Sequence, residues 1–497
     1  MSYQKLHETS KATSLFASIQ SLLEWDQETY MPNDAADYRG QQVSAIANLV
    51  HKQKTSPKFV KELKSLINLE TGAVLDTTLS PQLHASLREY RRDYLQASKI
   101  PASFVKLFSK TTSQGLHAWS YAKKNDRFSH FAPHLEKIVK LSRKKAEYLG
   151  YKDHPYDALL DLYEPGITVA TLTPLFSKLK TALTALVKEV ADRPRPPPIT
   201  GHFAESKQLE LSAHLLKIMG FDKGSSRLDL SMHPFCVFLH SKDVRMTTHL
   251  HTHTPFPCIF SVLHEGGHGL YDQGLPEEQY GSPLGEAASV AVHESQSRFW
   301  ETFIGHGLPF WKHFYPVLQK TYPETFTAIS LEDFYRTINT VKRSFIRIDA
   351  DEVTYSLHVI MRFEIEKALI EGSLKVKDLP KVWNQKMEEY LGVTPKTDAE
   401  GCLQDTHWAG GYFGYFPSYT LGNIYAAQLF DTFQKEHPQW EGQLALGDLS
   451  FVRLWLKEKI HKWGREYIPT QLIERATGSP VSESHYIHYL EKKYRAI

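Results

Sequence analysis

A pair of histidines near the middle of the chain constrains the fold more than any other feature of the sequence. His264 and His268 lie four positions apart, and Glu265 directly follows the first of them. On a helix, side chains four positions apart share one face with Cβ atoms about 5–6 Å apart, so two imidazole nitrogens can bind one cation. The residues before His264 are apolar, so we expect a buried helix. The pattern predicts a metal-binding helix on which Glu265 takes a proton from a metal-bound water.

The alternative interpretation is two histidines packed in a core with a glutamate between them. That interpretation has to explain Gly266 and Gly267, because each glycine costs about 1 kcal/mol in a helix interior. Small residues allow another backbone or a substrate to approach closely. The two glycines therefore favour a metal site.

A third ligand is expected from residues 286–300, which have the pattern of a second buried helix. Glu294 is the predicted ligand, because two histidines, one glutamate and an open water position are typical of catalytic zinc. His293 is the competing ligand, but it faces about 100° away on a helix, and we expect it to support the site or to pack in the core. Asp272, one turn after His268, is a candidate partner for a ligand imidazole.

Charge and composition exclude several classes of protein. The chain has 58 Lys and Arg against 56 Asp and Glu, a formal net charge of +2, which argues against binding nucleic acid through bulk positive charge. No run of 18 uncharged apolar residues occurs, so we expect no membrane span. The 3 cysteines in 497 residues are typical of a reducing compartment, which predicts a cytoplasmic protein.

Helix patterns dominate the chain. Two examples are the segments 133–149 and 173–190, with apolar residues at helical spacing, while strand patterns are confined to 235–239 and 243–248. The predicted class is therefore mainly α with a small β-sheet. Residues 191–201 contain four prolines and could separate two domains, but similar helical patterns on both sides favour a surface connector within one catalytic domain over residues 1–497.

Several motifs resemble those of the carboxypeptidase Taq family of metallocarboxypeptidases. The central match is HEGGH at 264–268 followed by HESQSR at 293–298. Further matching motifs follow the family's order: WDQETYMP at 25–32, HPF at 233–235, DVRMT at 243–247, IRIDAD at 346–351 and GYFPSY at 414–419.

The resemblance implies a fold, an activity and a cofactor. The implied fold is a large helical, two-lobed body with a deep active-site cleft, related to neurolysin-like and angiotensin-converting-enzyme-like peptidases. The implied activity is removal of C-terminal residues from peptides with broad specificity. The family also implies cytosolic homodimers and one divalent ion per chain, with zinc expected and cobalt as the alternative.

Hydrolysis of an amide also needs hydrogen-bond donors for the developing oxyanion. The spacing of His407 and Tyr419 resembles that of a pair which supplies such donors in neurolysin-like enzymes. We assign Tyr419 as the donor and His407 as its helper, with Tyr415 as a weaker candidate. The alternative is a glycine- and aromatic-rich loop packed for shape.

An exopeptidase must hold the free carboxylate of its substrate, and an arginine can do so with two hydrogen bonds. Arg347 is the first candidate, and its alternative is an ion pair with Asp349 or Asp351. Arg245 is the second candidate, although Asp243 would share its face of a strand and could pair with it.

His233 precedes a proline, so it is expected to be extended and to line the cleft. After Thr247, the sequence departs from the family pattern with a strip of alternating histidines, His249, His251 and His253. The strip could bind a second metal, but a surface at the edge of the cleft is the favoured interpretation.

Together these features predict a metal-dependent carboxypeptidase. The first alternative is a metallo-oligoendopeptidase with the same metal ligands. A non-catalytic helical scaffold with a structural metal is the alternative from another class, and it would require a fourth protein ligand.

Overall fold

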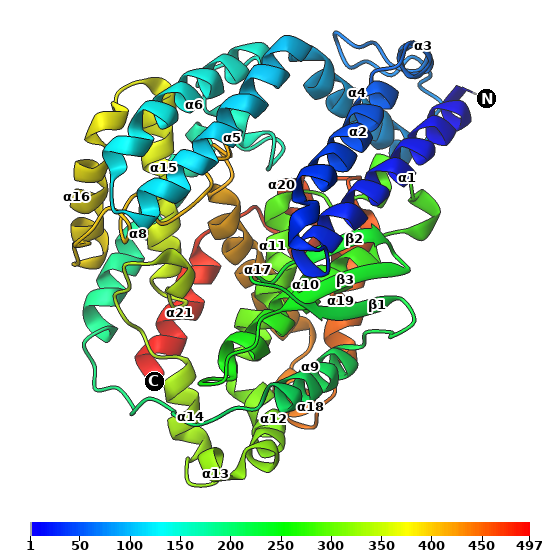
Figure 1. The fold of residues 1–497 in the computed structure, drawn as a ribbon. Helices are drawn as coiled ribbons and strands as arrows, with labels where there is room; N and C mark the ends of the chain where they lie inside the picture. Colours follow the sequence, from blue (N-terminus) through cyan, green and yellow to red (C-terminus); the bar gives the residue numbers. More distant parts are fainter. Residues whose placement is uncertain (1) are drawn as a thin grey trace. The chain divides into compact units, whose positions relative to one another are not determined.

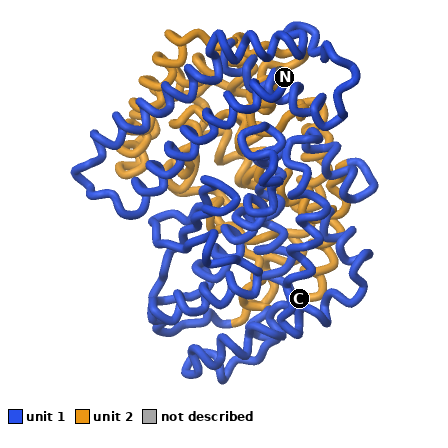
Figure 2. Tube along the Cα trace, turned by 90° about the vertical axis from the view of Figure 1, so that its right-hand side faces the viewer, with its two compact units in different colours: residues 1–98, 197–335, 429–480 blue, residues 99–196, 336–428, 481–497 orange. Residues whose placement is uncertain are grey.

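The computed structural model describes residues 2–497, which divide into two compact units (Figure 2). Unit 1 contains residues 2–98, 197–335 and 429–480, and unit 2 contains residues 99–196, 336–428 and 481–497. The boundary between Pro196 and Pro197 lies inside the proline-rich stretch 191–201, which therefore links the two units. Each unit is built from three separate chain segments. The single catalytic domain over residues 1–497 stays a prediction.

Unit 1 holds the chain's sheet and most of its helices (Figure 1). Its helices are α1 (Ser2–Thr29), α2 (Ala36–Lys54), α3 (Pro57–Lys64), α4 (Pro81–Lys99), α9 (Glu205–Met219), α10 (Phe256–Gly274), α11 (Val290–Arg298), α12 (Leu308–Thr321), α13 (Pro323–Phe326), α18 (Trp440–Ala445), α19 (Ser450–Lys459) and α20 (Pro469–Thr477). A π-helix, η4 (Phe299–Gly305), continues directly from α11.

Unit 2 is helical. Its helices are α5 (Ala102–Lys124), α6 (Phe128–Leu149), α7 (Asp157–Leu160), α8 (Val169–Val190), α15 (Tyr355–Glu371), α16 (Leu379–Leu391) and α21 (Ser484–Ala496). Helices α14 (Leu331–Ile338) and α17 (Pro417–Glu436) run from one unit into the other along the chain, and α4 ends one residue past such a boundary, at Lys99. Short 3-10 helices are η1 (Asn33–Ala35), η2 (Glu277–Gln279), η3 (Pro283–Gly285), η5 (Arg347–Asp349), η6 (Val376–Asp378) and η7 (His461–Trp463).

Within residues 2–497, the sheet has three strands in the order β1-β3-β2. They are β1 (Ser226–Leu230), β2 (Cys236–His240) and β3 (Asp243–Thr248). Strand β1 runs parallel to β3, and β2 runs antiparallel to it with an irregularity between Phe238 and His240. The sheet confirms the predicted class, mainly α with a small β component, although the sequence pattern missed β1.

Helix α10 is the structural centre of unit 1. It packs against β3, β2, α9, α11 and η4, and its Ile259, Val262, Leu263 and Leu270 are buried. This burial confirms the expectation for the helix that carries the two spaced histidines. The buried residues of α10 lie on every side of the helix and include Glu265 and Asp272, as expected for a helix inside the core.

Two helices begin earlier than the sequence pattern predicts. Helix α8 starts at Val169 because Thr168 and Thr171 form a reciprocal capping box, which satisfies the first free N–H groups. The predicted start of that segment, residue 173, therefore lies inside the helix, as does Pro174. Helix α6 similarly begins at Phe128, so Pro133 is not its first residue.

Across residues 2–497, none of the helices combines the length and the apolar character needed to cross a membrane.

Candidate metal centre and substrate-binding groups

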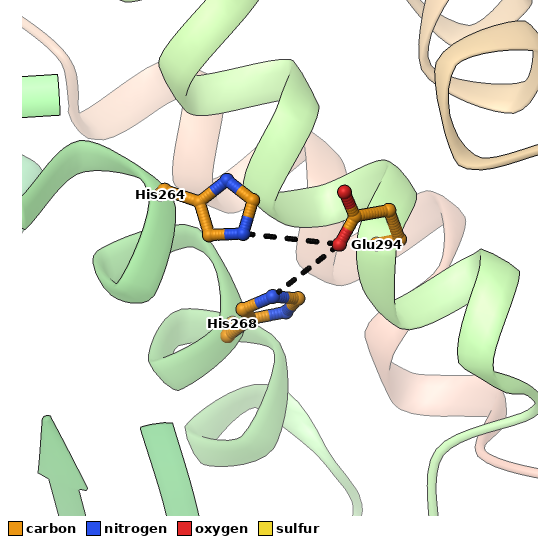
Figure 3. A group of neighbouring side chains, drawn as sticks. All are labelled: His264, His268 and Glu294. Carbon is orange, nitrogen blue, oxygen red and sulfur yellow. Dashed lines mark ion pairs between the residues drawn. The ribbon is translucent and has the colours of Figure 1, made fainter. Parts of the chain in front are cut away.

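Three side chains of unit 1 converge on one point (Figure 3). The Nε2 atoms of His264 and His268, on α10, lie 3.8 Å and 3.7 Å from Oε2 of Glu294, on α11. Ligand atoms about 2.0–2.2 Å from one tetrahedral metal are about 3.3–3.6 Å apart. The spacing of these donor atoms and their chemistry, two imidazoles and one carboxylate, therefore fit a divalent cation.

Close packing between α10 and α11 brings the three side chains together. A Cβ added to Gly267 would lie 2.6 Å from the carbonyl oxygen of Gln296 and 2.6 Å from Cα of Ser297. Only glycine allows this approach of one helix to the other. The expected reason for small residues in HEGGH, close approach by another backbone, is thus met at Gly267. At Gly266 the nearest atom would be the end of the Met219 side chain.

The Nδ1 atoms of His264 and His268, which do not face Glu294, each form a hydrogen bond with another side chain. Nδ1 of His264 donates to Oε2 of Glu301 at 2.8 Å, which leaves its Nε2 as the atom free to bind a cation. Nδ1 of His268 lies 2.5 Å from Nδ1 of His293, whose Nε2 is 3.0 Å from Oδ1 of Asp272. If Nε2 of His268 binds a cation, its Nδ1–H donates to His293, and His293 donates to Asp272.

Asp272 therefore contacts His268 indirectly, through His293. His293 itself faces His268 and Asp272, in agreement with the supporting position expected for it. Glu301 was missed by the sequence reasoning. Its spacing of seven residues from Glu294 on one helix face could have indicated it.

Glu265 lies between the two histidines in the sequence and is 7% exposed. Burial raises the pKa of its carboxyl to about 7, because a charged carboxylate is poorly solvated there. A carboxyl group with a pKa near neutrality can both accept and return a proton.

In unit 2, His407 and Tyr419 are hydrogen-bonded to each other. Nε2 of His407 lies 3.2 Å from the Tyr419 hydroxyl, and burial lowers the pKa of His407 to about 4. The neutral imidazole can hold the phenol in place. The ring of Tyr415 lies 5.6 Å from that of His407 and 5.3 Å from that of Tyr419.

Arg347 does not pair with Asp349 or Asp351, so the ion pair weighed from the sequence is wrong. Its Nε and Nη2 instead donate to Oδ1 of Asp405 at 3.1 Å and 2.8 Å, and its Nη1 donates to the Tyr355 hydroxyl. Asp405 lies far along the chain, in a different loop, so no local spacing could indicate it.

Asp405 is shared with a second arginine that the sequence reasoning did not identify. Arg362, on α15, is completely buried and donates from Nε to Oδ2 of Asp405 at 2.7 Å. Gln404 accepts hydrogen bonds from the backbone N–H of Arg347 and from Nη2 of Arg362. The three charged side chains and the amide form one connected cluster in which two guanidinium groups contact one carboxylate.

Arg245 pairs with Asp243 on β3, which confirms the pairing expected from the strand pattern. Two hydrogen bonds of 2.9 Å join them, and the guanidinium of Arg245 lies 4.5 Å from the ring centroid of Trp25. These contacts occupy most of the group, which weakens Arg245 as a carboxylate-binding residue.

The other histidines singled out from the sequence lie near the end of β1 and after β3. His233 is exposed, and Nδ1 of His249 donates to the carbonyl of Ser231 at 3.0 Å. The rings of His249 and His251 are 4.6 Å apart, and His251 and His253 are exposed. Within residues 2–497, the group of three close metal-binding side chains is His264, His268 and Glu294, so the geometry gives no support to a second metal at the strip.

A buried helix with two spaced histidines and a glutamate, facing a glutamate on the next helix, is the arrangement of a metal-dependent peptidase. The chain matches the family model of carboxypeptidase Taq (M32) metallopeptidase over residues 5–494 and belongs to that family. It is therefore a metallocarboxypeptidase, a peptide hydrolase that depends on a divalent metal. The resemblance drawn from the motifs is confirmed.

Similar proteins cover the chain almost completely. It is 41% identical to carboxypeptidase 1 of Bacillus subtilis over 97% of this chain and 96% of that protein. It is 39% identical to thermostable carboxypeptidase 1 of Thermus thermophilus over 100% of this chain and 98% of that protein. The crystal structure of the M32 carboxypeptidase from Deinococcus radiodurans R1 has a TM-score of 0.96 and 36% identity, and covers 100% of this chain and 99% of that one.

Proposed function

We propose that this metallocarboxypeptidase removes residues one at a time from peptides with a free C-terminus, with broad side-chain specificity. His264, His268 and Glu294 are the proposed ligands, with zinc as the expected metal and cobalt as the alternative. The observation that carries the proposal is the convergence of the two Nε2 atoms on Oε2 of Glu294. A divalent ion held there supplies positive charge that polarises the scissile carbonyl and the attacking water.

Glu265 is the proposed acid and base of the reaction. It takes a proton from the attacking water and returns it to the nitrogen of the leaving residue. Its burial and its pKa near 7 suit both directions of transfer. In unit 2, the Tyr419 hydroxyl donates to the carbonyl oxygen as negative charge develops, and His407 holds that hydroxyl. Tyr415 is kept as a weaker substrate contact.

Arg347 is the proposed binding residue for the substrate's terminal carboxylate. It and Arg362 both contact the single carboxylate of Asp405, so positive charge exceeds negative charge among these three residues. An anion adds the missing charge, and buried charges are stable only when paired. Arg245 and His233 are secondary candidates.

The decisive experiment treats the purified protein with a peptide of free C-terminus and follows the products by mass spectrometry. Stepwise loss of C-terminal residues that stops with chelator supports the proposal. A second, internally quenched peptide carries a blocked C-terminus. Cleavage of that peptide would instead identify a metallo-oligoendopeptidase. If neither peptide is cleaved in a metal-dependent way, the remaining interpretation is a non-catalytic scaffold with a structural metal.

Arg347→Gln tests whether Arg347 binds the terminal carboxylate of the substrate. We expect a raised KM for free-ended peptides, because a neutral amide loses the charged pair of hydrogen bonds. A matched variant, Arg343→Gln, removes a half-buried arginine that pairs with the exposed Asp192 elsewhere in unit 2 and should leave KM unchanged. Equal KM values for both variants would remove Arg347 from the binding site.

We also propose a cytoplasmic homodimer, on the basis of the family resemblance. Light scattering of the eluting protein during size-exclusion chromatography measures the dimer directly, and a monomeric mass at micromolar concentration would contradict it.

A further inference from the structure

Arg298 places a positive charge beside a predicted cation site, where simple electrostatics disfavours it. Its Nη1 donates to Oε2 of Glu301 at 2.7 Å, and its Nε lies 3.6 Å from Oε1 of Glu294. Its side chain is 14% exposed, so solvent screens its charge only weakly. A cation held by Glu294 would be repelled by this guanidinium, and the residue therefore requires another explanation.

The contacts of Arg298 supply that explanation. One guanidinium joins Glu294, which is a proposed ligand, to Glu301, which accepts the Nδ1–H of the ligand His264. The same oxygen of Glu301, Oε2, receives both hydrogen bonds. Arg298 thus fixes one carboxylate that faces the metal position and another that orients a ligand imidazole.

The local backbone brings these groups together. Glu294, Arg298 and Glu301 are spaced by four and then three residues across the junction of α11 and the π-helix η4, so they follow one helix face. Stretches of π-helix are frequently found at functional sites. His268 is held differently, by the imidazole of His293, so the effect of Arg298 is directed at His264 and Glu294.

We propose that Arg298 is a positioning residue for the metal centre, which gains affinity through the order that it imposes on Glu294 and Glu301 in spite of its like charge. The proposal rests on the ligand assignment of the proposed function. Positioning and charge repulsion make opposite predictions for removal of this arginine. Loss of positioning weakens metal binding, whereas loss of repulsion strengthens it.

The test measures the Zn²⁺ dissociation constant of the metal-depleted full chain by competition with a chromophoric chelator. For Arg298→Gln we expect affinity about 10–100-fold weaker than in the wild type, as for other residues that orient metal ligands. Arg298→Lys, which keeps the charge but lacks the planar fork of the guanidinium, should be intermediate. The Co²⁺ form should show a changed visible absorption spectrum in Arg298→Gln, because the ligand geometry is loosened.

Two controls separate the possible outcomes. Arg343→Gln removes an arginine–carboxylate pair of unit 2 and should bind Zn²⁺ like the wild type. His264→Ala tests the ligands themselves: if it binds as tightly as the wild type, or the wild type binds no ion, the proposed function fails. If His264→Ala loses binding while Arg298→Gln binds equally or more tightly, only the positioning proposal is overturned. If neither Arg298 variant folds, the residue serves the fold, and the proposal is also overturned.

Discussion

Gly267→Ala is the substitution whose consequences follow most directly from the structure. The added Cβ would lie 2.6 Å from the Gln296 carbonyl oxygen and from Cα of Ser297, whereas ordinary contact begins at 3.4 Å. Both neighbours are backbone atoms of α11 and cannot rotate away. Helices α10 and α11 must therefore separate by about 0.8 Å, the difference between these distances.

The cost has two parts of opposite sign. Overpacking of this kind costs about 1–3 kcal/mol, and replacing glycine by alanine in a helix returns about 1 kcal/mol. We expect a net loss of about 0–2 kcal/mol in the free energy of unfolding. The effect on activity should be larger, because Glu294 moves with α11 while His264 and His268 stay on α10. A misplacement of this order can lower the rate about 100-fold.

The assay compares Gly267→Ala with Gly266→Ala in urea unfolding, Zn²⁺ affinity and kcat/KM on a free-ended peptide. At position 266 the new Cβ would meet Cε and Sδ of Met219, at 2.6 Å and 3.0 Å, and this flexible side chain can move. Gly266→Ala should therefore keep near-normal activity. The reasoning is refuted if Gly267→Ala retains wild-type metal affinity and kcat/KM, or if the two variants are equally impaired.

Three further predictions concern chemistry and pH. Glu265→Gln should bind one Zn²⁺ per chain by elemental analysis but lose about 10²–10⁴ in kcat, and wild-type turnover would exclude it as the base. Tyr419→Phe should lower kcat by about 10²–10³ with little change in KM, and unchanged steady-state kinetics would remove Tyr419 from the mechanism. Burial lowers the pKa of His358 to about 3 and that of His407 to about 4 from the ordinary 6.5. Stability from these neutral groups is present above pH 6.5 and is lost as the pH falls toward the folded-state values, by about 2 kcal/mol each at pH 5. The urea midpoint of the wild type should therefore be lower at pH 5 than at pH 7, and the difference should be smaller in His358→Gln. Equal differences in the two proteins would contradict the assignment.

Local spacing predicted the features that a single helix determines. The four-residue interval of His264 and His268 indicated a shared face, and the apolar residues before them indicated burial, because both are properties of one periodic segment. Glu294 required only that the next helix pack against the first. The pairing of Arg245 with Asp243 likewise followed from the alternation of side chains along a strand.

Partners that meet through the tertiary fold were not accessible in this way. The sequence offered Asp349 and Asp351 as partners of Arg347 because they are near it in the chain, but Asp405 reaches it from another loop. Arg362 had no motif to distinguish it from other helical arginines. Strand β1 was missed because its sequence, SRLDL, is largely polar, and its buried residue is Asp229 whereas Leu230 is exposed.

The segmental construction of the two units has a consequence for biosynthesis. The proposed ligands and Glu301 come from one uninterrupted stretch of unit 1, whereas unit 2 includes residues 481–497, which are synthesised later. There, Lys493 and Tyr494 of α21 both contact the carboxylate of Glu352, each at 2.7 Å. On the ribosome, the histidine-bearing helix can meet α11 long before these contacts exist. Helix α21 leaves the exit tunnel after α10 and α11, so we expect unit 2 to complete its folding later than the histidine-bearing part of unit 1.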